Sequence, residues 1–123
     1  MSPKDIGEKL VAFCRDGNNQ ESIRTLYADD VVSVEAMAMG EQGPETHGKE
    51  AVLGKNQWWQ DNHEVHEASV EGPFPHGDDR FAVIFKYDVT SKPMGGRRMK
   101  FDEVGVFHVS DGKITREEFY YSM

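Results

Sequence analysis

The chain has 123 residues, of which 37% are hydrophobic, 11% aromatic and 29% charged, and its formal net charge at pH 7 is −8. This length and composition predict one globular domain over residues 1–123 and exclude a disordered chain. An acidic chain repels phosphate backbones, so we expect no nucleic-acid partner. No run approaches the roughly 18 apolar residues of a membrane span, and the first residues lack signal-peptide features. We therefore expect a cytoplasmic protein with no membrane contact.

Three helices are predicted in the first half of the chain. Ser2 can cap the first helix, with Pro3 in its first position, and Gly17 can end it. Asn19 can cap a second, shorter helix, and residues 49–62 form the third. Apolar residues recur at helical spacing on each: Ile6, Leu10, Phe13 and Cys14 on the first, Ile23, Leu26 and Tyr27 on the second, and Val52 and Trp59, with Lys55, on the third.

Strands are predicted elsewhere. Residues 31–36 alternate so that Glu35 shares a face with Val31 and Ser33, and residues 38–48 have the composition of a loop. Later, turn signals at Gly77-Asp78, Gly95-Gly96 and Asp111-Gly112 separate strand-like runs near 64–74, 80–91, 97–110 and 113–122. Helices followed by consecutive hairpins predict an α+β fold, because the helices must bury their apolar sides against one sheet face.

Alternation within these strands separates an inner from an outer face. The predicted inner sets are Phe81, Val83, Phe85, Tyr87 and Val89 in one run, and Phe101, Glu103, Gly105, Phe107 and Val109 in the next. The outer face is also partly apolar, at Ala82, Ile84, Val104 and Val106. An exposed apolar patch predicts a partner surface, and we expect a homodimer formed through the outer sheet face.

Several short motifs occur in an order and spacing that resemble a known superfamily. They are Leu26-Tyr27-Ala28-Asp29-Asp30-Val31, Gly48, and Asp111-Gly112-Lys113-Ile114. Together they resemble the cystatin-like rolls, which include SnoaL-type polyketide cyclases, ketosteroid isomerases and nuclear transport factor. The resemblance implies three N-terminal helices packed on a strongly curved antiparallel sheet that encloses a conical pocket. Because this superfamily contains both enzymes and plain binders, the resemblance does not name a substrate.

The resemblance also implies a candidate base. Glu35 falls where the isomerases keep the carboxylate that shuttles a proton on the steroid. The tyrosine and aspartate of the isomerase oxyanion hole would map to Val11 and Gly105, which cannot donate a hydrogen bond. Glu103, two residues before Gly105 and on the same face, offers a displaced carboxyl group. The substrate is therefore not expected to be a steroid.

Chemistry can be assigned to these residues in two ways. A carboxyl group among apolar side chains loses hydration, which raises its pKa. Glu35 could then abstract a proton next to a carbonyl while a protonated Glu103 donates a hydrogen bond to the developing oxygen anion, and His63 could assist as an acid or base. Alternatively, both glutamates pair with Lys55, Arg97 or a histidine and only stabilise the interior.

Further residues are predicted to bind the ligand or to be inert. Lys55 could anchor an anion, form a Schiff base, or pair with a pocket glutamate. His63 and His66 would point apart on a strand, so no metal site is expected, and no cofactor motif is present. Cys14 is expected to be a buried, inert thiol. The predicted ligand-binding residues are Lys55, Trp59, Phe85, Tyr87, Phe107, Glu117 and Phe119.

These features predict a protein that holds a small apolar molecule in its pocket. The first hypothesis is a cofactor-free isomerase, cyclase or lyase that acts on a small apolar carbonyl compound by acid–base catalysis. The alternative is a non-catalytic module that uses the pocket to hold a hydrophobic ligand or uses the sheet to dimerise.

Overall fold

The computed structural model describes residues 2–38 and 43–122, so residues 39–42 of the expected loop lie outside the described part. The helices are α1 (Pro3–Arg15), α2 (Asn19–Leu26) and α3 (Lys49–Asn62), with a short 3-10 helix, η2 (Lys92–Met94). The strands are β1 (Tyr27–Val34), β2 (Glu45–His47), β3 (His63–His76), β4 (Arg80–Ser91), β5 (Arg97–Ser110) and β6 (Lys113–Tyr120).

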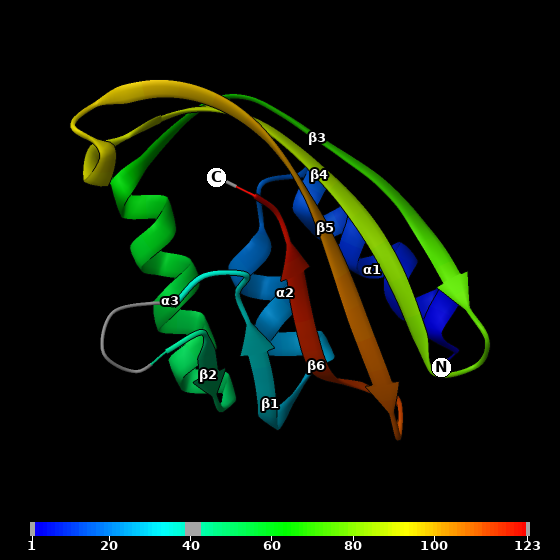
Figure 1. The fold of residues 1–123 in the computed structure, drawn as a ribbon. Helices are drawn as coiled ribbons and strands as arrows, with labels where there is room; N and C mark the ends of the chain where they lie inside the picture. Colours follow the sequence, from blue (N-terminus) through cyan, green and yellow to red (C-terminus); the bar gives the residue numbers. More distant parts are fainter. Residues whose placement is uncertain (1, 39–42, 123) are drawn as a thin grey trace.

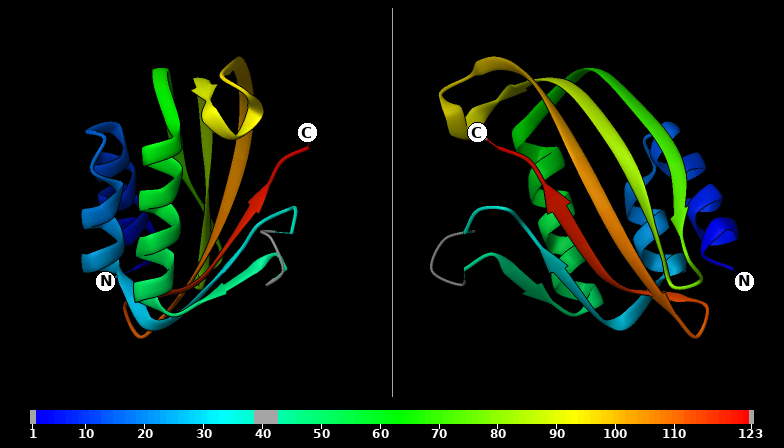
Figure 2. Two further views of the ribbon diagram at one scale, coloured as in Figure 1. Left: turned by 90° about the vertical axis from the view of Figure 1, so that its left-hand side faces the viewer. Right: turned by 45° about the vertical axis from the view of Figure 1, so that its right-hand side comes forward.

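The strands form one curved sheet in the order β2-β1-β6-β5-β4-β3. The long strands β3, β4 and β5 arch over the helices (Figure 1), and all three helices lie on the concave side (Figure 2). This arrangement confirms the predicted α+β roll. The sheet is not wholly antiparallel, since β1 runs parallel to β6 while β3 to β6 form antiparallel hairpins.

Helix α1 begins as its sequence predicts and packs closely on the sheet. The Ser2 hydroxyl accepts a hydrogen bond from the Asp5 backbone, and the Asp5 carboxylate accepts one from the Ser2 backbone. This reciprocal capping satisfies N–H groups that have no partner within the helix. Gly7 allows the close contact with β3, because a Cβ atom there would lie 2.6 Å from Cβ of Pro73. The buried residues of α1 are Ile6, Gly7, Leu10 and Val11.

The core lies between the helices and the concave face. Phe81 and Phe107 are fully buried and stack with ring centroids 5.1 Å apart. Val31 from β1 and Ile114 from β6 are also fully buried, so each half of the sheet contributes to one apolar cluster. In the parts of the chain that the structure describes, no helix has the length and apolar character needed to cross a membrane.

Two expectations about the first half of the chain are wrong in detail. Tyr27, assigned by its spacing to the second helix, instead begins β1, which therefore starts four residues earlier than predicted. Residues 45–47, expected to be loop, form β2 and pair with the end of β1. Sheet pairing overrides local propensity here, because the Tyr27 side chain is buried against Glu117 of β6.

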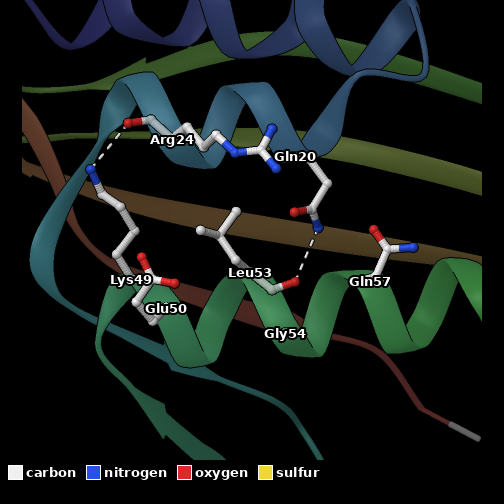
Figure 3. A pocket seen from close by; sticks show the side chains of 7 residues that line it. All are labelled: Gln20, Arg24, Lys49, Glu50, Leu53, Gly54 and Gln57. Carbon is white, nitrogen blue, oxygen red and sulfur yellow. Dashed lines mark hydrogen bonds between the residues drawn. The ribbon is translucent and has the colours of Figure 1, made fainter.

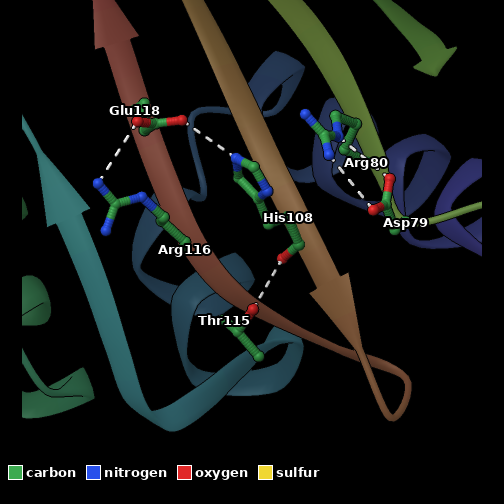
Figure 4. Close-up of polar contacts among 6 residues, drawn as sticks. All are labelled: Asp79, Arg80, His108, Thr115, Arg116 and Glu118. Carbon is green, nitrogen blue, oxygen red and sulfur yellow. Dashed lines mark hydrogen bonds and ion pairs between the residues drawn. The ribbon is translucent and has the colours of Figure 1, made fainter.

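The outer face of the sheet mixes apolar and charged residues. Val104 is exposed there, whereas Ala82, Ile84 and Val106 are half-buried. Beside them, Glu118 accepts hydrogen bonds from Arg116 at 3.4 Å and pairs with His108 at 3.0 Å (Figure 4). The apolar patch predicted from the sequence is thus narrow and bordered by ion pairs.

Candidate functional site

A cavity of about 510 Å³ lies between the concave face of the sheet and the helices. Its volume is within the usual range for small-molecule sites. The structure places every site residue predicted from the sequence in the wall of this one cavity: Glu35, Lys55, Trp59, His63, Phe85, Tyr87, Glu103, Phe107, Glu117 and Phe119. Of its three carboxyl groups, Glu35 and Glu117 belong to one hydrogen-bonded network, and Glu103 lies outside that network.

Glu35 lies just after β1 and is held by two donors. Its Oε1 accepts a hydrogen bond from Lys55 Nζ at 2.9 Å, and its Oε2 accepts one from Tyr121 Oη at 3.0 Å. The Glu35 and Lys55 side chains are only 14% and 13% exposed, so solvent screens this ion pair less than a surface pair. Burial, and then the charge of Glu35, raises the pKa of the Tyr121 phenol, which therefore stays a donor.

The same network continues to the cavity floor at Glu117. The Ser33 hydroxyl donates a hydrogen bond to Glu117 at 2.6 Å, and the Tyr27 phenol donates to the other carboxyl oxygen. Lys55 Nζ in turn donates to the Ser33 hydroxyl at 2.5 Å. Burial raises the pKa of Glu117, although Lys55 and the two hydrogen bonds oppose the shift. Glu117 is only 3% exposed, so its polar partners make its burial possible.

Glu103 is different, because no described residue forms a hydrogen bond or ion pair with it. It lies on β5, opposite Phe85 of β4, and lines the cavity. Burial raises its pKa to about 8, and the charges of Glu35 and then Glu117 add to this shift. Lys55 opposes it. At neutral pH, Glu103 is therefore mostly a protonated carboxylic acid whose O–H can donate to a ligand.

His63, at the start of β3, has both ring nitrogens engaged by the protein. Its Nδ1 lies 2.8 Å from the Trp59 carbonyl oxygen, and its Nε2 lies 3.1 Å from the Ser91 hydroxyl. A carbonyl oxygen can only accept, so this geometry assigns the proton to Nδ1. The ring also stacks on Trp59, with centroids 4.4 Å apart. His63 therefore lines the cavity with no free nitrogen directed at Glu35.

Aromatic rings supply most of the remaining wall. Tyr87 packs between Trp59, at a centroid distance of 5.3 Å, and Phe101, at 5.4 Å. Phe119 lies below Lys55, whose Nζ is 5.5 Å from the ring centroid. Apolar surroundings of this kind disfavour the charged form of a carboxyl group. The rings also offer apolar surface to a ligand.

Cys14 also lines the cavity without adding chemistry. Burial, and then the charge of Glu117, raises the pKa of its thiol to about 12. The thiol therefore stays protonated at neutral pH and is a poor nucleophile.

The positions that the isomerase resemblance assigns to the oxyanion hole belong to the core. Val11 is 3% exposed. At Gly105, an added Cβ atom would lie 2.8 Å from the Phe107 ring and 3.2 Å from the Phe85 ring. No side chain fits at residue 105 unless these rings move, so any oxyanion donor must come from elsewhere in the cavity.

Sequence reasoning missed three polar members of the site: Tyr27, Ser33 and Tyr121. Ser33 and Tyr121 could have been found, because the alternation puts Ser33 on the same face as Glu35 and Tyr121 on the same face as Glu117. Tyr27 could not, since its spacing fitted the apolar side of the preceding helix. Only the fold brings its phenol to Glu117.

A second hollow lies between α2 and α3 (Figure 3). Two of its polar side chains, Lys49 and Gln20, already have protein partners. Lys49 Nζ donates to the Arg24 carbonyl oxygen at 3.1 Å and lies 3.6 Å from Asp29. The Gln20 amide donates to the Leu53 carbonyl oxygen at 3.0 Å. With Lys49 and Gln20 already bonded to the protein, this hollow is a weaker candidate than the main cavity.

Comparison with known proteins agrees with this architecture. A sequence model described as the SnoaL-like domain matches residues 1–121. A solved protein from Mesorhizobium loti is 46% identical to this chain. It is described both as a SnoaL-like polyketide cyclase and as a carbohydrate phosphatase. The match covers 98% of this chain and 100% of that chain, with a TM-score of 0.91. A search of curated proteins gave no match.

More distant structures share the fold alone. A protein of unknown function with a cystatin-like fold from Xanthomonas campestris is 15% identical, with coverage of 100% and 92% and a TM-score of 0.77. A protein with a ketosteroid isomerase-like fold from Catenulispora acidiphila, solved with trimethylamine, is 21% identical, with coverage of 94% and 85% and a TM-score of 0.70. The family match and the 46% identical structure together show that this chain belongs to the SnoaL-like domain family.

Proposed function

We propose that the protein is a cofactor-free acid–base enzyme that moves a proton on the carbon next to the carbonyl group of a small apolar compound. One observation carries the proposal: two carboxyl groups, Glu35 and Glu103, line one apolar cavity but differ in their partners and therefore in their charge. Carboxyl groups whose surroundings separate their protonation states can divide the roles of base and acid. Membership of the SnoaL-like family is consistent with small-molecule binding.

Glu35 is the proposed base. Lys55 and Tyr121 each donate one hydrogen bond to a different oxygen of the carboxylate. An ionised carboxylate offers about four acceptor positions, so each oxygen keeps capacity to receive a substrate proton. The two donors also fix the carboxylate in one orientation, which reduces the entropic cost of reaching the reacting C–H bond.

Glu103 is the proposed oxyanion donor. As Glu35 takes the proton, the electron pair of the broken C–H bond moves onto the carbonyl and its oxygen becomes negative. The O–H of a protonated Glu103 can donate a hydrogen bond to this oxygen inside the water-poor cavity. Return of the proton to a different carbon gives isomerisation, attack of the new carbanion on a second carbonyl gives ring closure, and loss of a neighbouring group gives elimination.

The second candidate function is ligand binding without catalysis. It is favoured by the ion pair between Glu35 and Lys55, which also suits a purely structural carboxylate. Both candidates place an apolar molecule in the cavity, so binding alone does not separate them. Exchange of the substrate C–H protons with solvent separates the two candidate functions.

The test is deuterium exchange into a linear methyl ketone, followed by proton NMR in D₂O. Wild-type protein should accelerate exchange next to the carbonyl, and Glu35→Gln should lower the protein-catalysed rate by about 100-fold or more, the usual contribution of a positioned base. Glu67→Gln on the exposed part of β3 is the matched control and should leave the rate unchanged. Equal exchange by wild type and Glu35→Gln would refute the proposed base, and ketone binding without exchange would favour the binding module.

We also propose that two copies pair through the outer sheet face. The support is the cross-strand pair of Val104 and Tyr120, which are 36% and 55% exposed. The expected cytoplasmic location stays a prediction from the sequence.

A further inference from the structure

We propose that the ligand is an elongated, amphipathic carbonyl compound whose apolar tail leaves the cavity between Trp58, Val65 and Met94. The inference rests on the proposed function only in placing the carbonyl end near Glu35 and Glu103. It adds the shape of the ligand, its direction in the cavity and the residues that select for its length.

The opening of the cavity is marked by large apolar side chains that face solvent. Trp58, Val65 and Met94 are 47%, 45% and 48% exposed, yet all three line the cavity. A side chain that is both half exposed and part of the cavity wall lies where the cavity meets solvent. We call these three residues the apolar rim. They come from α3, β3 and η2, so three separate elements bring apolar surface to one opening.

None of the three rim side chains is needed by the core. Trp58 is adjacent to Trp59 on α3, and neighbouring helical residues diverge by about 100°. Trp59 therefore takes the inner position, while Trp58 stays half exposed with its ring edge-on to His63, at a centroid distance of 6.3 Å. Val65 lies at an irregularity in the pairing of β3 with β4. Met94 is in the short η2 turn, and its flexible thioether side chain can adapt to different apolar partners. Apolar surface gathered at a cavity opening is typical of a binding groove.

The polarity of the cavity sets the direction of the ligand. Glu117, at 3% exposure, and the Glu35–Lys55 pair, at 14% and 13%, belong to the shielded end. The apolar rim is at the exposed end. A ligand with a single polar group therefore places that group inside, where donors and acceptors lie, and directs its hydrocarbon tail outward. A wholly polar ligand would leave the rim uncovered.

Tail length should then control affinity in a way that depends on the rim. Burying one methylene group changes a binding constant by about fourfold. While the growing tail is still inside the cavity, rim substitutions should have little effect on affinity. Once the tail reaches the opening, each added methylene should improve binding only where the apolar rim is intact.

The experiment uses linear methyl ketones of increasing tail length and measures the dissociation constant by isothermal titration calorimetry. In wild type, affinity should rise with each added methylene, including tails long enough to reach the opening. Trp58→Ser and Met94→Ser should bind the shortest ketones within about twofold of wild type and the longest ketones about tenfold or more weakly. Phe74→Ser is the matched control, since Phe74 is 49% exposed but does not line the cavity; it should behave as wild type.

Two results would overturn the inference: an equal loss for short and long ketones in the rim variants, or the same length-dependent loss in Phe74→Ser. Rim substitutions are at exposed positions, and thermal unfolding of each variant checks that it is folded. The readout is binding, so failure of the proposed catalysis is seen separately. Length-dependent binding without C–H exchange would support the proposed role of the apolar rim and refute the proposed catalysis.

Discussion

Glu103 owes its unusual protonation to what surrounds it. Glu35 has an ammonium group and a phenol within hydrogen-bond distance, and Glu117 has a phenol and a hydroxyl. Glu103 has none of these among the described residues. Burial raises the pKa of Glu103, and the charges of Glu35 and then Glu117 add to the shift. In the described part of the chain, no hydrogen-bond donor stabilises the charged form of Glu103, so only the charge of Lys55 opposes its raised pKa.

The raised pKa of Glu103 makes the stability of the protein depend on pH. In the unfolded chain this carboxyl group titrates near its ordinary value of 4.5, whereas in the fold it titrates at about 8. Below pH 4.5 Glu103 is protonated in both the folded and the unfolded state, so its ionisation does not reduce the free energy of unfolding. Between these values the unfolded state ionises alone, so the free energy of unfolding falls as pH rises, and the loss is complete above about pH 8.

We compare the free energy of unfolding of Glu103→Gln with that of wild type at two pH values. The difference in favour of Glu103→Gln should be larger at pH 9 than at pH 4, by an amount on the order of a few kcal/mol. Urea unfolding at both pH values measures this change. Glu67→Gln should show no such pH-dependent gain. An identical wild-type-to-Glu103→Gln difference at pH 4 and pH 9 would show that Glu103 is not held neutral by the fold.

The sequence predicts on which face a side chain lies when its residue belongs to a regular helix or strand. Alternation placed Glu103 on the inner face, and helical spacing placed Lys55 beside the apolar residues of its helix. What alternation cannot supply is which partner each group meets across the sheet. Lys55 reaches Glu35 because α3 packs on β1, and Tyr121 reaches Glu35 because the chain end lies beside that strand. These contacts depend on tertiary structure alone.

Helix α1 is positioned by the close approach of its backbone to strand β3. Gly7 faces Pro73 of β3, and a methyl group there would lie 2.6 Å from one proline carbon and 2.9 Å from another. Both contacts are shorter than real Cβ contacts allow. Gly54 of α3, by contrast, has open space around it. Substituting these two helical glycines by alanine therefore distinguishes the effect of packing on stability from the effect of helix propensity.

Gly54→Ala should raise the free energy of unfolding by up to about 1 kcal/mol, because alanine favours the helix over glycine. Gly7→Ala gains the same propensity but must displace α1 from the sheet, and overpacking of this kind costs about 1–3 kcal/mol. We expect Gly7→Ala to be net destabilised in urea unfolding. Equal stabilisation by both substitutions would show that α1 does not pack on β3 as described.

The long hairpins and three helices could be predicted because each has many residues with a consistent period. Strand β2 could not, since it has three residues and lies in a segment rich in turn-forming residues. The parallel pairing of β1 with β6 could not be read locally either. It joins the segment around residue 30 to the segment around residue 117, and no local pattern reports such a pairing.

The outer sheet face is the surface through which we propose that two copies pair. Its apolar part is narrow and is bordered by the cluster of Arg116, His108 and Glu118. A two-fold interface uses the same patch on both copies, so a charge placed at its centre would face its own copy.

Val104→Asp should therefore shift the proposed dimer toward monomer, raising its dissociation constant by at least about tenfold. Size-exclusion chromatography with light scattering measures the mass. Glu67→Gln, which lies away from this patch, should remain dimeric. A wild-type protein that is monomeric at all accessible concentrations would exclude the outer face as a self-association surface.

In the proposed reaction Glu103 acts in its protonated form, opposite a Glu35 carboxylate that is paired with Lys55, during proton transfer next to a carbonyl. The pH dependence of deuterium exchange into a methyl ketone tests this most directly. The wild-type rate should fall as pH rises through about 8, because Glu103 then loses the proton that it donates. In Glu103→Gln this alkaline decline should be absent. An alkaline decline that persists unchanged in Glu103→Gln would contradict the account.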